Sequence, residues 1–166
     1  MKRNITALCI VAATLVLDVL TKNFIVDNIN LYERHDYLDG FLRITLVYNQ
    51  GGVFGILQGY KNMFLIVSVI VLALMVAYFF YEKNKSLLFT VSLSLIISGA
   101  IGNIIDRLIP GRPGVVDFIS VGVDGVYRWP AFNVADSVIV VGACLLVIVF
   151  YQEEKRRKAL EQQSGE

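Results

Sequence analysis

Four long runs of apolar residues alternate with more polar segments along the 166-residue chain. They cover residues 5–26, 63–81, 87–105 and 132–151. A helix rises about 1.5 Å per residue, so each run of roughly 20 residues is long enough to cross a hydrocarbon core about 30 Å thick. The pattern predicts an all-α polytopic membrane protein with four transmembrane helices, in which residues 1–166 form a single integral membrane domain.

The connections after the first and third runs carry β-strand signals. Phe41–Tyr48 is rich in aromatic and β-branched residues, and Val123–Val126 contains the Asp-Gly pair typical of a two-residue hairpin loop. We therefore expect a small antiparallel sheet, which could hold an extended peptide by backbone pairing or form a lid over the helices. Trp129 and Pro130 fit an interfacial anchor and the start of the fourth helix.

Basic residues are distributed unevenly between the two sides of the predicted bundle. Short segments at the start of the chain, after the second run and after the fourth run hold closely spaced basic residues, namely Lys2, Arg3, Lys83, Lys85 and Lys155–Lys158. The positive-inside rule makes these segments cytoplasmic. Both termini, with the tail 152–166, are then inside, and the connections 27–62 and 106–131 lie on the extracytoplasmic side.

Composition supports a membrane protein and excludes a nucleic-acid partner. Hydrophobic residues make up 56% of the chain and charged residues 17%, and the mean hydropathy is +0.64. A net charge of +1 with scattered basic residues provides no concentrated basic face for phosphates. Cys9 and Cys144 lie in apolar runs and are interpreted as free packing residues, and His35 is the only histidine, so we expect neither a metal site nor a cofactor.

Two aspartates lie in apolar sequence, Asp117 between pairs of large apolar residues and Asp136 within the fourth run. A buried carboxylate costs several kcal/mol unless it is paired, hydrated or protonated. Two such acids facing each other across a polar pocket could share a proton, as an acid/base hydrolase requires. The alternatives are polar residues that hold helices together, or the ion pathway of a proton-coupled transporter.

An Asn-x-x-Asp spacing occurs twice, as Asn103–Asp106 at the end of the third run and Asn133–Asp136 at the start of the fourth. On a helix this spacing places amide and carboxylate on one face, so both pairs could line one pocket. Asp136, six residues after Pro130, would lie about 9 Å along its helix. Asp106 is expected to join an ion-pair network at its helix end.

Two further polar features allow more than one interpretation. Asp18 and Lys22 are four residues apart in the first run, so they could form a structural ion pair or contribute to an active site. Asn49 precedes Gln50, Gly51 and Gly52, where glycines permit tight turns. Its amide could reach toward the helices, or it could cap a structural turn.

Five blocks of the sequence together resemble the lipoprotein signal peptidase family, bacterial signal peptidase II, and they occur in order along nearly the whole chain. The blocks are Leu17–Asp18 with Lys22, Asn49–Gly55, Gly102–Arg107, Val115–Ile119 and Phe132–Ser137. The resemblance implies an aspartic endopeptidase whose catalytic dyad is Asp117 and Asp136. It also implies residues that bind substrate or support the site: Asp18, Lys22, Asn49, Gly51, Asn103, Asp106, Arg107 and Asn133.

The same resemblance implies the substrate and the location. The expected substrate is a prolipoprotein, cut just before a diacylglyceryl-modified cysteine by a site near the extracytoplasmic face of the bacterial cytoplasmic membrane. The expected partners are therefore such prolipoproteins and membrane lipids. The sequence defines no oligomeric state, and a monomer is our expectation. A proton-coupled transporter and a non-enzymatic membrane scaffold are the alternative functions.

Overall fold

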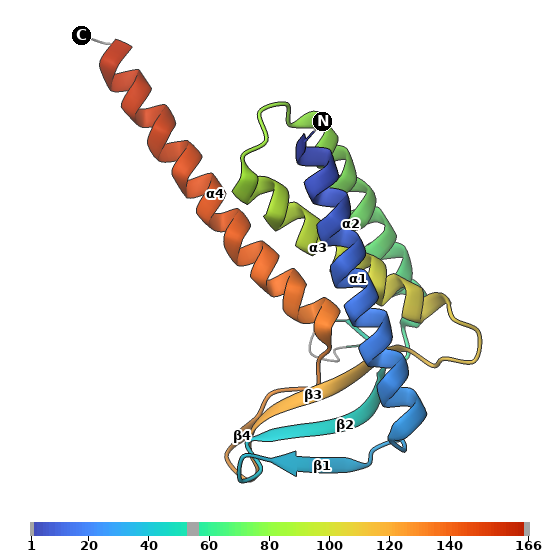
Figure 1. Cartoon of the computed structure of the whole chain (residues 1–166). Coiled ribbons are helices and arrows are strands. Elements are labelled where there is room, and N and C mark those ends of the chain that lie inside the picture. The colour runs from blue at the N-terminus through green and yellow to red at the C-terminus, as the bar shows by residue number, and fades with distance from the viewer. Residues whose placement is uncertain (1, 53–56, 165–166) are drawn as a thin grey trace.

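Four long helices dominate the computed structural model, which describes residues 2–52 and 57–164 (Figure 1). They are α1 (Lys2–Asn28), α2 (Lys61–Tyr81), α3 (Leu87–Leu108) and α4 (Val134–Ser164). Within the described part of the chain, four helices are long and apolar enough to cross a membrane. The predicted architecture, four spanning helices with a small antiparallel sheet, is confirmed.

The fourth helix departs most from its expected bounds. It begins two residues later than residue 132 and continues past residue 151 through the charged tail to Ser164. The tail sequence favours this extension because Lys, Glu, Gln and Ala are good helix formers. Glu154 and Lys158 also form an i,i+4 ion pair of 2.6 Å between Oε1 and Nζ. In Figure 1 the end of α4 extends beyond the other helices.

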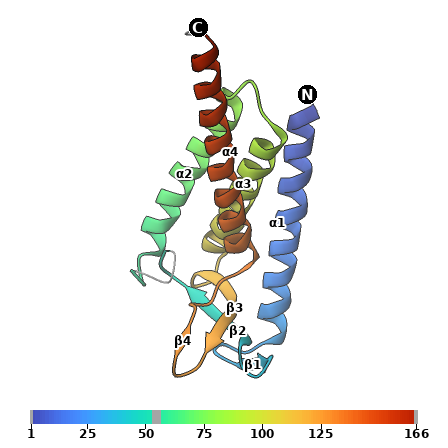
Figure 2. The same cartoon turned by 90° about the vertical axis from the view of Figure 1, so that its left-hand side faces the viewer.

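Helix α3 packs against each of the other three helices, and Figure 2 shows α1 and α2 on opposite sides of α3 and α4. Small residues permit the close contact between α3 and α4. A Cβ atom at Gly99 would lie 2.4 Å from the carbonyl oxygen of Ala135, and one at Gly142 would lie 2.7 Å from that of Ser92. Close backbone approach at small residues is the usual way for helices to associate in a membrane.

The sheet lies at the end of the bundle opposite the two termini (Figure 1). Its strands, in spatial order, are β1 (Arg34–Tyr37), β2 (Leu42–Asn49), β3 (Val115–Val123) and β4 (Tyr127–Arg128), and all neighbours are antiparallel. β2 confirms the strand expected at residues 41–48. β1 was not predicted, because its four residues are all exposed and show no alternating pattern.

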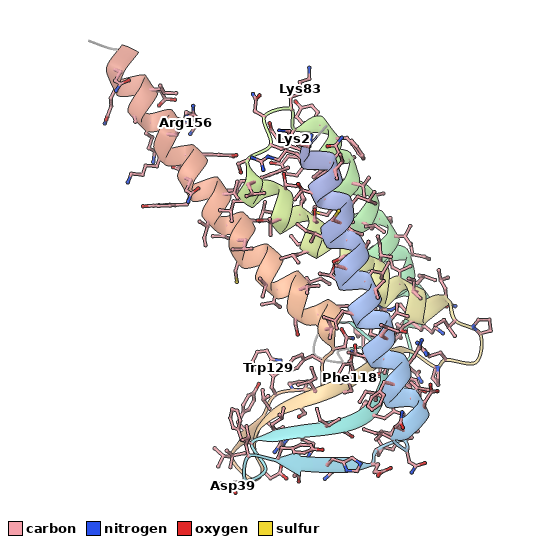
Figure 3. All side chains as sticks on the ribbon, viewed as in Figure 1. Lys2, Asp39, Lys83, Phe118, Trp129 and Arg156 are labelled. Carbon is pink, nitrogen blue, oxygen red and sulfur yellow. The ribbon has the colours of Figure 1, made fainter. Side chains whose placement is uncertain are left out.

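An apolar cluster joins the sheet to the first helix. Ile25 of α1 packs with Leu46, Val116 and Phe118 of the sheet, and all four side chains are buried. Figure 3 shows Phe118 between β3 and α1. This cluster fixes β3, and therefore Asp117, against the end of the helix bundle.

The hairpin between β3 and β4 forms where expected, but its loop is longer than the predicted two residues. Val123 pairs with Tyr127, which leaves residues 124–126 in the loop, and the Val126 N–H donates to the Val123 carbonyl at 3.2 Å. Gly125 has a φ of 81°, whereas Asp124 is not among the residues with positive φ. A two-residue type I′ loop needs positive φ at both central positions. Because Asp124 lacks it, Val123 pairs with Tyr127 and the loop has three residues.

The fourth helix, expected from about residue 132 with Pro130 just before it, begins later than the sequence predicted. Phe132 is still part of the sheet region, because it exchanges backbone hydrogen bonds with Ile119 at 2.8 and 2.9 Å. The helix begins at Val134, so Asp136 lies in its first turn and not about 9 Å along it. Asp136 is therefore close to the sheet.

Candidate active site

Asn133 links the two aspartates that the sequence singled out. Asp117 lies on β3 and Asp136 lies in the first turn of α4. The Asn133 amide Nδ2 donates to Asp117 Oδ1 at 2.7 Å. At the helix start, the Asp136 N–H donates to Asn133 Oδ1 at 2.8 Å and the Asn133 N–H donates to Asp136 Oδ2 at 3.2 Å. One buried asparagine thus holds both carboxylates.

This reciprocal pair of bonds is a capping box, in which a residue before the helix and one in its first turn satisfy each other's backbone N–H groups. The Asn133–Asp136 spacing was predicted to place both side chains on one helix face. The structure corrects this, because Asn133 precedes the helix as its cap. The cap therefore fixes the position of Asp136 at the helix start through two hydrogen bonds.

Two more asparagines complete the hydrogen bonding of the carboxylates. Asn49 Nδ2 donates to Asp117 Oδ2 at 3.0 Å, and Asn103 Nδ2 donates to Asp136 Oδ1 at 2.8 Å. Asn103 Oδ1 in turn accepts from Asn133 Nδ2 at 3.2 Å. The three asparagines come from β2, α3 and the start of α4, so the structure brings together both Asn-x-x-Asp pairs, as the sequence predicted.

The two carboxylates differ in their environment. Asp117 is 2% exposed, whereas Asp136 is partly accessible. Burial, and to a smaller extent the nearby negative charge of Asp136, raise the pKa of Asp117 to about 8, against the opposing effect of the amide hydrogen bonds from Asn49 and Asn133. Such an asymmetric pair can supply one neutral and one ionised carboxyl group.

Lys22 lies at the centre of a buried charged cluster beside this pair. Its Nζ lies 2.8 Å from Asp18 Oδ2 and 3.0 Å from Asp106 Oδ2, and it donates to Asn103 Oδ1 at 3.0 Å. Asp18 Oδ1 also accepts from the Ala135 N–H at 2.8 Å. The predicted Asp18–Lys22 ion pair is therefore present, and it also contacts an asparagine that holds Asp136.

Asp106 takes part in an ion-pair network, as expected, but with partners other than its neighbour in sequence. It pairs with Lys22 and with Arg112, and it accepts from the Val116 N–H at 3.1 Å. Arg112 also donates to Asn23 Oδ1 at 3.2 Å. Arg112 was not predicted as a site residue, because nothing in its local sequence pattern indicates a partner on another element.

Arg107 and Gly51 connect the third helix to the turn after β2. Arg107 donates to the Gly51 carbonyl at 3.0 Å and to the Asn103 carbonyl at 3.1 Å. Asn49 Oδ1 accepts from the Gly51 N–H at 2.9 Å and from Gln58 Nε2 at 3.1 Å. Asn49 thus both caps a turn and reaches an aspartate, so its two interpretations are compatible. Gln58 was not anticipated.

Part of the predicted block after β2 cannot be placed, since Val53, Phe54 and Gly55 lie outside the described residues. Within the described ranges, no three His, Cys, Asp or Glu side chains are grouped so as to hold a metal ion. Cys9 and Cys144 are free thiols, and His35 contacts Glu33 at 2.9 Å.

Comparison with known families agrees with the arrangement of this site. The family model described as signal peptidase (SPase) II matches residues 10–152. The chain belongs to the signal peptidase II family. The resemblance seen in the sequence is confirmed, and with it the assignment of this membrane protein as a peptidase that removes signal peptides from prolipoproteins. The transporter and scaffold alternatives are thereby set aside.

Individual relatives and solved structures support the same family. The lipoprotein signal peptidase of Staphylococcus haemolyticus is 39% identical over 142 residues, covering 85% of this chain and 88% of the relative. That of Staphylococcus aureus is 35% identical over 140 residues, covering 84% of each. A solved bacterial membrane enzyme, described at 2.3 Å resolution, superimposes with a TM-score of 0.80 at 34% identity over 91% of this chain and 90% of that one. A second, described at 1.9 Å, gives 0.74 at 35% identity over 87% and 92%.

Proposed function

We propose that this signal peptidase is an aspartic endopeptidase in which Asp117 and Asp136 form the catalytic pair. The observation that carries the proposal is the shared hydrogen bonding of the two carboxylates through Asn133. Each carboxylate also receives a second amide donor, from Asn49 or Asn103. Two carboxyl groups with different environments are what general acid–base hydrolysis of an amide needs.

The asymmetry of the pair assigns a role to each acid. Asp117, whose pKa is raised to about 8, is protonated at neutral pH and donates a hydrogen bond to the scissile carbonyl oxygen. Asp136, the more accessible acid, is ionised and takes a proton from the attacking water. The water oxygen bonds to the carbonyl carbon, which becomes tetrahedral as the carbonyl oxygen takes the proton from Asp117.

Collapse of that intermediate completes the reaction. The bond between carbon and nitrogen breaks, the leaving nitrogen takes the proton held by Asp136, and the hydroxyl proton returns to Asp117. The products are a carboxylic acid on the signal peptide and a free amine on the lipoprotein. Both acids end in their starting protonation states, so the cycle needs no cofactor.

The surrounding polar residues act as positioning residues in this scheme. Asn49, Asn103 and Asn133 hold the carboxylates by hydrogen bonds. Five further residues hold those asparagines and the turn after β2 in place, and they are Asp18, Lys22, Gly51, Asp106 and Arg107. Locked rotamers of this kind keep reacting groups in productive geometry.

The location of the site supports cleavage before a diacylglyceryl-modified cysteine. The two aspartates lie where the helix bundle meets the sheet, so acyl chains can remain in lipid while water reaches the scissile bond. In Figure 3 the basic residues Lys2, Lys83 and Arg156 lie at the opposite end from Asp39 and Trp129 of the sheet region. By the positive-inside rule the sheet and the site are extracytoplasmic, and both termini are cytoplasmic.

The test is cleavage of a purified diacylglyceryl-modified prolipoprotein by reconstituted wild type, Asp117→Asn and Asp136→Asn. We expect each variant to lose about 10²- to 10⁴-fold in kcat/KM, the usual contribution of general acid–base catalysis. The mass of the new N-terminus should identify the lipidated cysteine as the first residue after the cut.

Asp39→Asn, in the exposed turn between β1 and β2, is the matched control and should cleave at the wild-type rate. Far-ultraviolet circular dichroism and unfolding in detergent establish that each variant is folded. Near-wild-type cleavage by either folded dyad variant would disprove the proposed catalytic pair.

A further inference from the structure

The sheet contains a hollow that the catalytic scheme does not use. Its volume is about 180 Å³, the space of roughly six water molecules at ~30 Å³ each. Three arginines, Arg34, Arg43 and Arg128, contribute to its lining together with Thr45 and Val47 of β2. A hollow of this size and composition is suited to an acidic side chain.

Two of the three arginines are already paired across the sheet. Arg43 donates to Asp36 at 2.6 and 3.0 Å and to Asp124 Oδ2 at 2.7 Å. Arg128 donates to Asp124 at 2.7 Å and to the Gly40 carbonyl at 2.6 Å. These bonds join the β1–β2 turn to the β3–β4 turn, and hydrogen bonds from the two arginines lower the pKa of Asp124 to about 2. Arg43 and Arg128 are therefore held in place on one side of the hollow.

Arg34 provides the unmatched charge. Among residues 2–52 and 57–164 its guanidinium has neither a hydrogen bond nor an ion pair, and the Thr45 hydroxyl likewise has no partner there. Arg34 and Thr45 are directly opposite each other in the β1–β2 ladder, so their side chains share one face of the sheet. A carboxylate in the hollow would receive a charged donor from Arg34 and a hydroxyl donor from Thr45.

The hollow adjoins the catalytic pair. Val47, which lines it, is the ladder partner of Asp117. Thr45 lies two residues further along β2, where the pairing with β3 shifts register between Ile44 and Val47, so the two positions are at most about 7 Å apart at 3.4 Å per residue. An extended peptide spans that distance with two or three residues.

We propose that the hollow selects an acidic side chain in the segment of the substrate that follows the cut, two or three residues beyond the scissile bond. This inference rests on the proposed function. The signal-peptide side of the substrate is apolar and stays among the helices, whereas the chain after the lipidated cysteine leaves the bundle past the sheet. The residues after the cut therefore pass Arg34.

The experiment uses full-length enzyme in vesicles of zwitterionic lipid, with a parallel set that contains anionic lipid. The substrates are diacylglyceryl-modified prolipoproteins with Glu or Lys at each of the second to fifth positions after the cut. Wild type should cleave the Glu substrate about fivefold faster than the Lys substrate, in kcat/KM at low salt, at the second or third position. Arg34→Glu should reverse this preference, and Arg34→Gln should abolish it. Arg156→Glu makes the same change in net charge at the far end of α4 and should leave the preference unchanged.

The outcomes separate this inference from the proposed function. If wild type cleaves none of the substrates, the proposed function fails and the selectivity fails with it. If wild type cleaves all of them, but the Glu/Lys ratio is the same in wild type and Arg34→Glu, only the selectivity is disproved. If Arg34→Glu slows both substrates equally, and only in vesicles that contain anionic lipid, the hollow binds a lipid headgroup and the inference is overturned.

Discussion

At the residue scale, the site depends on a difference between two chemically identical side chains. Asp117 is almost fully buried on a strand, and Asp136 is partly accessible at a helix start. Both accept two N–H hydrogen bonds, so hydrogen bonding alone does not distinguish them. Their unequal contact with water does, because removal from water disfavours the charged form.

The raised pKa of Asp117 predicts the alkaline limit of activity. The proposed mechanism needs Asp117 protonated, and its pKa is raised to about 8, so the active fraction falls as pH rises through that value. We expect kcat/KM to drop about tenfold for each pH unit well above 8. Measurement from pH 5 to pH 10 with a reconstituted substrate checks this, and circular dichroism at pH 9.5 checks that the enzyme stays folded. A rate that stays constant or increases to pH 9.5 would contradict the assignment of Asp117 as the acid.

The sequence singled out the polar residues that cluster in the structure, but it did not predict most of their contacts. Asp117 and Asp136 were identifiable because a carboxylate in apolar sequence is unusual. The hydrogen bonds of Asn133 were not predictable from the sequence. An Asn-x-x-Asp spacing fits both a helix cap and a pair on one helix face, and only the position of the helix start distinguishes them. Arg112 contacts residues on α1 and α3 and no sequence rule links such distant positions.

At the element scale, Lys22 holds α1 against α3 and, through Asp18, against the start of α4. All three charged groups of the Asp18–Lys22–Asp106 cluster are nearly inaccessible to solvent. Removal of one partner from a buried charged group leaves an uncompensated charge, which typically costs 3–5 kcal/mol. The cluster therefore couples helix packing to the position of Asn103, which bonds both Lys22 and Asp136.

We predict that Lys22→Met lowers the free energy of unfolding by about 3 kcal/mol and greatly reduces cleavage. Titration with sodium dodecyl sulfate in mixed micelles measures the first effect. Asp18→Asn combined with Lys22→Met should destabilise by about 1–2 kcal/mol less than the sum of the single changes, since the two groups interact directly. Lys155→Met, an exposed lysine on the tail of α4, is the control. Additive effects of the two buried changes would show that the pair is not coupled.

The sequence determined the helices of the fold more reliably than its sheet. A span of about 20 apolar residues has one stable solution in lipid, because each backbone group must be bonded within the segment. The short strands depend on partners elsewhere in the chain. β1, with four exposed residues, pairs with β2 through the turn that joins them and through the ion pair between Asp36 and Arg43.

At the scale of the whole molecule, apolar side chains that are exposed in the absence of a bilayer form the lipid-facing surface. Within α2, Phe79 is the one buried residue among those described, and many of its apolar side chains, such as Ile66, Ile70 and Leu74, are exposed. Buried charged residues are instead concentrated where the helices meet the sheet, and they include Asp18, Lys22, Asp106 and Asp117. In the proposed function, this division would let a lipid-modified substrate approach the aspartates from the bilayer.

This arrangement predicts which end of the molecule faces the cytoplasm. Val126 lies in the β3–β4 loop and Asn84 in the connection between α2 and α3, both exposed and at opposite ends of the bundle. In a background with Cys9→Ala and Cys144→Ala, a membrane-impermeant maleimide applied to intact cells should label Val126→Cys. Asn84→Cys should be labelled only after the membrane is disrupted, because the basic residues beside it, Lys83 and Lys85, favour the cytoplasm. Retained cleavage activity shows that each variant has the native topology. Labelling of Asn84→Cys in intact cells, with Val126→Cys protected, would show the opposite topology and place the two aspartates near the cytoplasmic face.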